Sequence, residues 1–341
     1  MIGIRVDVNR QIATGHVMRC LSIAFGMRNA GIDCIFITAD ENAKLIVSSN
    51  GFEAICLNSQ WDALDREIEP LVNVIQENKI DKLIIDSYYV TEHYLERLMA
   101  HAKVIYIDDM NFFRYPVSMV VNYNIYYEIF FYPELYSGTD TQFLLGCNYA
   151  PLRNEFKLVT PLYRETVEKI LITTGGTDRY NMAGKFLNRI IEDGLFKGIE
   201  FHVVVGKLNN HLNCLQRLSG RSYSIVLHQD VKAMSELMTD CDIAITAGGS
   251  TMYELCACGV PAICFTFADN QLYGAKSFER EGLMAYAGDV RNGEKQCIAN
   301  MIAYIEEYIS NPKLRKEKST NMLKKVDGSG VARIIKAIVD L

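Results

Sequence analysis

The sequence predicts an α/β protein built of two successive Rossmann-like halves. Short apolar runs of strand length alternate with helical patterns along both halves of the chain. Glycine-containing turns follow several of these runs. The length of 341 residues is more than one hydrophobic core usually serves, and the hydrophobic content of 49% with 22% charged residues is that of a globular protein. We therefore expect two domains, each with a core of its own.

The first half alternates strands and helices in the order of a parallel sheet. Its strands are predicted at about 2–7, 33–38, 53–56, 81–86, 103–107 and 117–121. Its helices are predicted at about 15–30, 41–50, 62–79 and 91–101. A polar stretch with Pro161, from Asn154 to Glu168, indicates a linker after this half.

The second half repeats the same alternation. Its strands are predicted at about 168–173, 200–205, 222–226, 242–246 and 261–265. Its helices are predicted at about 179–193, 208–218, 231–239, 250–258 and 270–282, and the tail from about 294 to 341 is helical. The expected domains are residues 1–155, residues 156–320, and a last helix at 321–341.

Composition excludes several classes of function. The net charge of -6 and the lack of a dense basic block predict that nucleic acid is not a partner, because proteins that bind nucleic acids carry basic patches. No apolar stretch approaches the ~18 residues of a membrane span, and the N-terminus enters a strand at once. We expect a cytoplasmic protein with no stable membrane association. Its ten cysteines are scattered, as in reduced proteins, and Cys256 and Cys258 point in different directions on a helix.

The segment from Asp240 to Phe265 reads as strand, glycine turn, helix and second strand. Gly248 and Gly249 permit a tight turn, and Ser250 and Thr251 open a helix whose first N–H groups have no partner within the helix. Such a helix start binds anions. The segment therefore predicts a cradle for a nucleotide diphosphate that involves Gly249, Ser250 and Thr251.

A carboxylate lies one helical turn beyond this cradle. Glu254 follows Ser250 by four residues, so it occupies the same helix face about 6 Å further along, within reach of a ribose diol. The polar loop after the next strand contributes Asn270 and Gln271. The alternative for the glycine pair is an ordinary turn of an α/β protein, and for Glu254 it is a solvated helix residue.

A second glycine loop follows the strand at 168–173. Gly175, Gly176 and Thr177 would let backbone amides approach a phosphate from the other side. The alternative is a plain strand-to-helix turn in which Asp178 caps the helix. The loop around Val231 is the expected border of the base pocket.

The N-terminal strand leads into a second polar motif, QIATGHVMRC, at residues 11–20. His16 would stand at the start of a helix, where the partial positive charge favours the neutral imidazole of a general base. Arg19 lies one turn further, and Asp7 ends the strand at the edge where open α/β sheets bind ligands, so both are candidate catalytic residues together with His16. Gly15 leaves room for a ligand beside the turn. The commoner fate of a single histidine is a cap or an exposed position.

Further polar residues follow the other strands of the first half. Asp86, Tyr88, Asp108 and Asn122 are candidates for substrate contacts, and for Asp86 and Asp108 a structural capping role is nearly as well supported. Adjacent carboxylates such as Asp108 and Asp109 often divide into one ligand-facing and one capping residue. We expect no metal site and no cofactor.

The motifs together resemble known families. The segment 240–271 is similar to the UDP-binding signature of GT-B enzymes such as the peptidoglycan N-acetylglucosaminyltransferase. The N-terminal Arg-x-Asp and Gly-His-x-x-Arg-Cys motifs resemble the UDP-2,4-diacetamido-2,4,6-trideoxy-β-L-altropyranose hydrolases of the pseudaminic acid pathway. Further segments resemble the same family, and they begin at Asp86, Tyr106, Asn122, Leu144 and Thr173.

This resemblance implies a GT-B fold, in which two Rossmann-like domains face a central cleft and the last helix crosses back to the first domain. It implies hydrolysis of a UDP-sugar at C1 with inversion, by C–O cleavage and without a metal, in nonulosonic acid or surface polysaccharide biosynthesis. His16 would activate the water. The alternatives are a glycosyltransferase that uses a UDP-sugar donor, a hydrolysing 2-epimerase, and a non-catalytic UDP-sugar-binding protein. The sequence does not indicate the oligomeric state.

Overall fold

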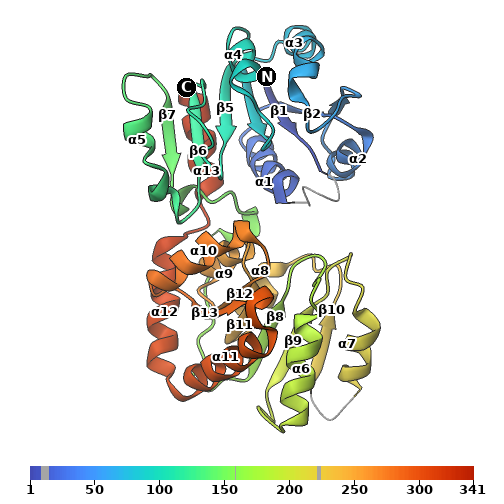
Figure 1. Ribbon diagram of the computed structural model, residues 1–341, viewed down its shortest axis with the longest axis vertical. Helices are drawn as coiled ribbons and strands as arrows, with labels where there is room; N and C mark the ends of the chain where they lie inside the picture. Colours follow the sequence, from blue (N-terminus) through green and yellow to red (C-terminus); the bar gives the residue numbers. More distant parts are fainter. Residues whose placement is uncertain (9–14, 158, 221–223) are drawn as a thin grey trace. The chain divides into compact units, whose positions relative to one another are not determined.

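A computed structural model describes residues 1–8, 15–157, 159–220 and 224–341. The chain divides into two compact units (Figure 1). Unit 1 comprises Met1–Asn154 together with Gly328–Leu341, and unit 2 comprises Glu155–Asp327. Within the described part of the chain, no helix is both long and apolar enough to cross a membrane.

Unit 1 is an open parallel sheet with helices packed on it. The strands run in the spatial order β3-β2-β1-β4-β5-β6-β7. Their bounds are β1 (Ile2–Val6), β2 (Cys34–Thr38), β3 (Ala54–Cys56), β4 (Lys82–Asp86), β5 (Lys103–Ile107), β6 (Met119–Asn122) and β7 (Gln142–Leu145). The helices are α1 (Gly15–Asn29), α2 (Glu41–Ser49), η1 (Leu64–Glu67), α3 (Ile68–Glu77), α4 (Glu92–Met99), η2 (Tyr127–Phe130), α5 (Tyr132–Leu135), η3 (Cys147–Tyr149) and α13 (Gly330–Asp340).

Helix α13 completes unit 1, although it comes from the end of the chain (Figure 1). It packs on α1, where a side chain at Gly26 would overlap Val331 and Ile335. Its buried residues Ile334 and Ile338 face the unit, and its end is held by a hydrogen bond from Lys82 Nζ to the carbonyl of Val339. The last helix is therefore part of the first core.

Unit 2 is a second parallel sheet, in the order β10-β9-β8-β11-β12-β13. Its strands are β8 (Lys169–Thr173), β9 (Glu200–Val204), β10 (Ile225–His228), β11 (Ile243–Ala247), β12 (Ala262–Thr266) and β13 (Ala285–Asp289). Its helices are η4 (Asn154–Phe156, which begins at the boundary), α6 (Met182–Glu192), α7 (Leu212–Ser219), α8 (Met234–Thr239), α9 (Thr251–Cys258), α10 (Asp269–Arg280), α11 (Val290–Ser310) and α12 (Pro312–Lys325).

Strands β7 and β13 are not among those predicted from the sequence. Both are edge strands. Residues 142–145 give a run of only four in which Gln142 is exposed, and β13 contains Gly288 at φ 117°, which weakens any strand pattern. Part of the strand predicted at 222–226 lies outside the described residues, and the described β10 begins at Ile225.

Candidate functional site

The switch point of the sheet in unit 1 carries a cluster of polar side chains. Strands β1 and β4 are parallel neighbours, with Val6 opposite Asp86. The chain continues from β1 to β2 on one side and from β4 to β5 on the other. The carboxyl ends of β1 and β4 therefore flank the place at which open α/β sheets bind ligands.

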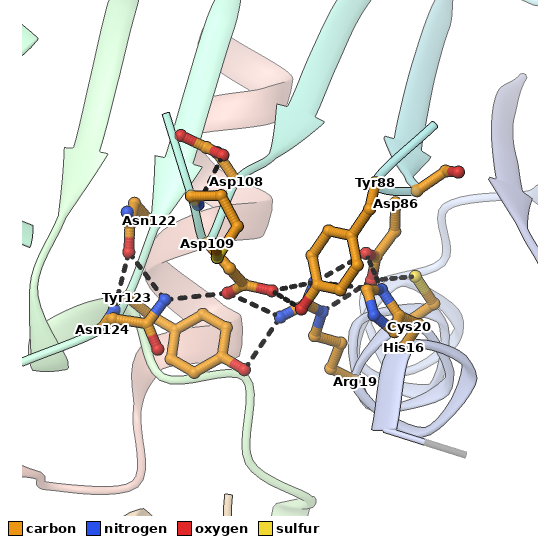
Figure 2. A network of polar contacts seen from close by, with 12 residues as sticks. His16, Arg19, Cys20, Asp86, Tyr88, Asp108, Asp109, Asn122, Tyr123 and Asn124 are labelled. Carbon is orange, nitrogen blue, oxygen red and sulfur yellow. Dashed lines mark hydrogen bonds and ion pairs between the residues drawn. The ribbon is translucent and has the colours of Figure 1, made fainter. Parts of the chain in front are cut away.

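His16 and Asp86 meet at this place (Figure 2). His16 lies in the first turn of α1, Asp86 is the last residue of β4, and Nδ1 of the imidazole contacts Oδ1 of the carboxylate. Because a carboxylate only accepts hydrogen bonds, Nδ1 carries a proton in this contact, so in the neutral ring Nε2 holds the lone pair. Nη2 of Arg19 also lies 3.2 Å from Nδ1, but both atoms are donors in this tautomer, so the carboxylate is the partner.

Arg19 lies between two buried carboxylates. Its Nε and Nη2 each donate to Asp86 over 2.6 Å, a bidentate pair. On its other edge, Nη1 donates to Asp109 Oδ1 over 3.0 Å, and Nη2 lies 2.8 Å from Oδ2 of the same carboxylate. One guanidinium thus fixes side chains that come from α1, from β4 and from the loop after β5.

The guanidinium also keeps both carboxylates ionised. Burial alone would raise the pKa of Asp86, but Arg19 and His16 outweigh burial and hold this pKa below its usual range. Burial likewise acts to raise the pKa of Asp109, and Arg19 again reverses the shift so that the pKa is lowered. Arg19 contributes one positive charge to the cluster, and the ionised Asp86 and Asp109 contribute two negative charges.

Aromatic and amide groups complete the cluster. Tyr88 donates its hydroxyl to Asp109 over 2.9 Å, and its ring meets the His16 ring edge-on with centroids 4.6 Å apart. Tyr123 accepts from Arg19 Nη1 over 3.1 Å, and Asn124 Nδ2 donates to Asp109 over 2.8 Å. Tyr88 is 36% exposed, whereas His16 is 7% exposed, so Tyr88 is the more accessible of these two rings.

Asp7, expected as a catalytic residue, lies in a different ion pair. Its Oδ2 accepts from Arg5 Nη1 over 2.6 Å and its Oδ1 accepts from the amide of Ala39 over 2.7 Å. Arg5 in turn binds Glu67 through Nε and Nη2, and all three side chains are buried. Asp7 therefore ties β1 to the end of β2, and both of its oxygens are engaged in these structural contacts.

Three of the expected substrate contacts also have structural partners. Asp86 is 2% exposed, and its oxygens are bound by His16, Arg19 and the thiol of Cys20. Asp108 accepts from the amides of Met110 and Asn111 and from Tyr115 and Tyr132. Asn122 is fully buried between Asn124 and Tyr132.

The sequence interpretation did not name Asp109 or Asn124 as members of this cluster. The pair Asp108-Asp109 does divide into a capping residue and a residue of the cluster, but Asp109 is the one that faces Arg19. Successive residues beyond a strand point to opposite sides, and the sequence alone does not say which side faces the crevice. Residues 9–14 of the N-terminal motif lie outside the described residues, and Gly15 begins α1.

In unit 2, the two glycine loops predicted from the sequence follow neighbouring strands. β8 and β11 are parallel, with Thr173 opposite Thr246. The chain leaves β8 towards β9 and leaves β11 towards β12, so this pair flanks the switch point of the second sheet. Both loops therefore begin at the same edge of the sheet, on adjacent strands.

The loops of unit 2 expose backbone at this edge. Gly175, at φ 84°, occupies a conformation that favours glycine, and Gly175, Gly176 and Thr177 are exposed. Asp178 accepts from the first amides of α6, at Met182 over 2.8 Å, which is the capping role considered from the sequence. This capping role is compatible with anion binding by the same loop. Asp178 binds an amide at the start of α6, whereas the amides proposed for an anion are those of Gly175, Gly176 and Thr177.

The second loop leads into α9. Gly249 and Ser250 are exposed, a side chain at Gly249 would meet no atom within 4 Å, and Ser250 precedes the first residue of α9, Thr251. Glu254 lies one turn into α9 and is partly buried.

The other predicted residues of unit 2 lie at the start of α10 and in the loop between β10 and α8. Gln271 Oε1 accepts from the amide of Phe267 over 2.9 Å, which holds the turn before α10, and Asn270 is exposed in the first turn of that helix. Val231 lies partly buried between β10 and α8. In the residues described here, no group of three His, Cys, Asp or Glu side chains is placed to hold a metal ion.

Comparisons with known proteins agree with this architecture. The family model of the glycosyltransferase family 28 C-terminal domain matches residues 170–337. An uncharacterised protein of Methanocaldococcus jannaschii is 28% identical over 77% of this chain, which spans only 54% of that protein.

Two further relatives carry functional names. The spore coat polysaccharide biosynthesis protein SpsG of Bacillus subtilis is 23% identical over 100% of this chain and 98% of its own length. The UDP-2,4-diacetamido-2,4,6-trideoxy-β-L-altropyranose hydrolase of Campylobacter jejuni is 24% identical over 76% of this chain and 90% of its own length.

Solved structures show the fold. MurG of Acinetobacter baumannii superposes with a TM-score of 0.73 over 100% of this chain and 99% of that chain, at 12% identity. The chain therefore has the GT-B type of fold with two Rossmann-like units, which confirms the fold class predicted from the sequence.

Replacing Arg19 by Met tests the charge balance of the cluster. In the wild-type protein, Asp86 and Asp109 have lowered pKa values, so their ionised forms add stability above about pH 4, and this stability is lost as the pH falls through the folded-state pKa. Without Arg19 the two buried carboxylates lose their cation, and we expect the free energy of unfolding to fall by about 3–5 kcal/mol at pH 7. Because protonation removes the uncompensated charges, this deficit should shrink as the pH is lowered from 7 towards 5.

Denaturant unfolding of both proteins between pH 5 and pH 8 measures this difference. Arg28→Met is the matched control, because Arg28 donates to the carbonyl of Gly51 and stacks on Phe52. Its deficit should not vary with pH. A deficit of Arg19→Met that is equally large at pH 5 and pH 8 contradicts the charge assignment.

Proposed function

We propose that the chain is a UDP-sugar hydrolase, which releases UDP and a free sugar by attack of water on the anomeric carbon C1. The observation that carries the proposal is the pairing of His16 with Asp86 at the switch point of unit 1, which leaves the lone pair of Nε2 for a proton. The proposed substrate is UDP-2,4-diacetamido-2,4,6-trideoxy-β-L-altropyranose or a close relative, used in nonulosonic acid or surface polysaccharide biosynthesis. The name of the C. jejuni relative supports this choice.

In the proposed reaction, His16 acts as the general base. The oxygen of water bonds to C1 while the bond between C1 and the β-phosphate oxygen breaks, and the electron pair leaves with UDP. The proton of the water passes to Nε2 of His16. A single displacement of this kind inverts the configuration at C1.

Asp86 and Arg19 are positioning residues in this scheme. Asp86 accepts from Nδ1 and so fixes the tautomer and the ring, and Arg19 fixes Asp86 through two hydrogen bonds. Proton uptake by His16 changes the total charge of His16, Arg19, Asp86 and Asp109 from −1 to 0. The buried carboxylates therefore stabilise the imidazolium at the moment it forms.

We assign the nucleotide to unit 2. The backbone amides of Gly175–Thr177 and of Gly249–Thr251 would take up the charge that develops on the leaving diphosphate, helped by the N-terminus of α9. Glu254 would bind the ribose hydroxyls, with Val231 at the base and Asn270 and Gln271 towards the sugar. The scheme needs neither a metal ion nor an organic cofactor.

A glycosyltransferase is the second candidate. The match to the glycosyltransferase family 28 C-terminal domain and the likeness to MurG favour it. The same base would then deprotonate an acceptor hydroxyl instead of water, and the nucleotide would be bound in the same way.

Release of UDP in the absence of any acceptor tests the proposal. We expect the purified protein to hydrolyse one member of a panel of UDP-diacetamido-trideoxyhexoses in the presence of EDTA. In ¹⁸O-labelled water the label should enter the sugar and not UDP, and early NMR spectra should show the inverted anomer. Release only on addition of an acceptor indicates the transferase, and a product epimerised at C2 indicates an epimerase. Binding of the UDP-sugar without any turnover indicates a non-catalytic binding protein.

His16→Asn tests the general base. We expect kcat to fall by about a hundredfold or more, because general-base catalysis is worth at least that much, while UDP affinity stays within about tenfold. His93→Gln is the control, since His93 is exposed on α4. Turnover of His16→Asn at the wild-type rate rules out this mechanism.

Glu254→Ala tests the nucleotide assignment independently of catalysis. Loss of a charge-assisted contact to the ribose should weaken UDP binding by about ten- to a hundredfold, seen mainly in KM. Calorimetric titration with UDP and 2′-deoxy-UDP sharpens the test, because the wild type should discriminate between them and the variant should not. Glu306→Ala, on the exposed side of α11, serves as the control. Equal UDP affinity of Glu254→Ala and wild type removes the ribose assignment.

A further inference from the structure

A main-chain contact joins the loop after β8 to the loop after β9 in unit 2. A β-carbon added at Gly206 would lie 2.3 Å from the carbonyl oxygen of Gly176 and 2.6 Å from its carbonyl carbon and Cα. These atoms belong to the backbone, so no side-chain rotation can make room. Only glycine at position 206 permits this approach without moving the loop that contains Gly176.

Hydrogen bonds hold the two loops in this relation. The amide of Leu208 donates to the carbonyl of Gly176 over 3.2 Å, and the amide of Asn209 closes a turn by donating to the carbonyl of Gly206 over 3.0 Å. Just before this turn, the amide of Val205 donates to the carbonyl of His228 at the end of β10 over 2.8 Å. The turn at 206–209 is therefore anchored on both sides.

This contact fixes the direction of one particular amide. The carbonyl of Gly176 and the N–H of Thr177 belong to the same peptide group, and in a planar trans peptide they point in opposite directions. Because the carbonyl points at residues 206–208, the N–H of Thr177 is directed away from them. Thr177 and its two preceding glycines are exposed at the carboxyl edge of the sheet, where an anionic ligand can meet this N–H group.

We propose that Gly206 is a positioning residue for diphosphate recognition, which aims the N–H of Thr177 at the ligand by holding the carbonyl of Gly176. This inference rests on the proposed binding of UDP by unit 2. Gly206 itself touches no ligand in this scheme. Its effect passes through the backbone of Gly176, which an alanine at 206 would displace by about 1 Å, a shift of the size that costs up to a hundredfold where geometry is critical.

Gly206→Ala tests the proposal when diphosphate and nucleoside ligands are compared. We expect the Kd for UDP to rise by about tenfold or more, while the Kd for uridine, followed by ligand-observed NMR titration, stays within about twofold. Gly220→Ala is the matched control in the same unit, since its nearest neighbour would lie at an ordinary 3.7 Å and it should bind both ligands like the wild type.

The outcomes separate this inference from the proposed function. UDP affinity of Gly206→Ala equal to wild type overturns the inference alone, as does an equal loss of UDP and uridine affinity, which would indicate a general packing role. Failure of the wild-type protein to bind UDP overturns the nucleotide assignment and the inference together. Should Gly206→Ala not fold, Leu208→Pro replaces it, because it removes the donor to the Gly176 carbonyl and adds no atom at position 206; the same loss for UDP over uridine is expected.

Discussion

The guanidinium of Arg19 is the group on which the polar cluster of unit 1 depends. Two buried carboxylates at the switch point of a sheet would repel each other and would tend to become protonated. Arg19 binds both, and it thereby connects α1 to the end of β4 and to the loop after β5. The orientation of His16 follows, since Asp86 can hold Nδ1 only while it stays ionised and in place. In the proposed scheme Arg19 contacts no substrate, but it holds Asp86 and thereby determines the orientation of His16, the general base.

The two units use the same topological feature with different chemical groups. Each sheet reverses its strand order beside its first strand, at β1 and β4 in unit 1 and at β8 and β11 in unit 2. Unit 1 fills this edge with charged side chains held by bidentate contacts, which suits proton transfer. In unit 2 the corresponding edge carries exposed glycine loops and the start of a helix. These groups suit a diphosphate, because backbone amides bind anions without a change of protonation. This division supports the assignment of catalysis to one unit and nucleotide binding to the other.

The sequence predicted the regular part of the fold well and the cluster only in outline. Buried parallel strands are short apolar runs between glycine turns, so β1, β4, β8 and β11 were predicted within one or two residues. His16 and Arg19 were identified because helix starts and one-turn spacing are local properties. The roles of Asp7 and Asp86 depend on partners 32 and 70 residues away, Ala39 and His16, and no local pattern encodes them. The choice between Asp108 and Asp109 turned on which side of β5 faces the crevice, and Gly206 acquires its meaning only from Gly176, thirty positions earlier in the chain.

The hydrolase and the transferase differ in the nucleophile and share the base. Both require an imidazole that accepts a proton, and in either case the proton would bring the total charge of His16, Arg19, Asp86 and Asp109 from −1 to 0. The dyad therefore supports catalysis of displacement at C1 without choosing between water and an acceptor hydroxyl. What distinguishes the two reactions is whether a second hydroxyl occupies the space next to Nε2. Tyr88 packs its ring edge-on against His16, donates its hydroxyl to Asp109 and is 36% exposed, so it is an accessible neighbour of the imidazole. In either scheme, proton transfer to His16 depends on the buried network of Arg19, Asp86 and Asp109.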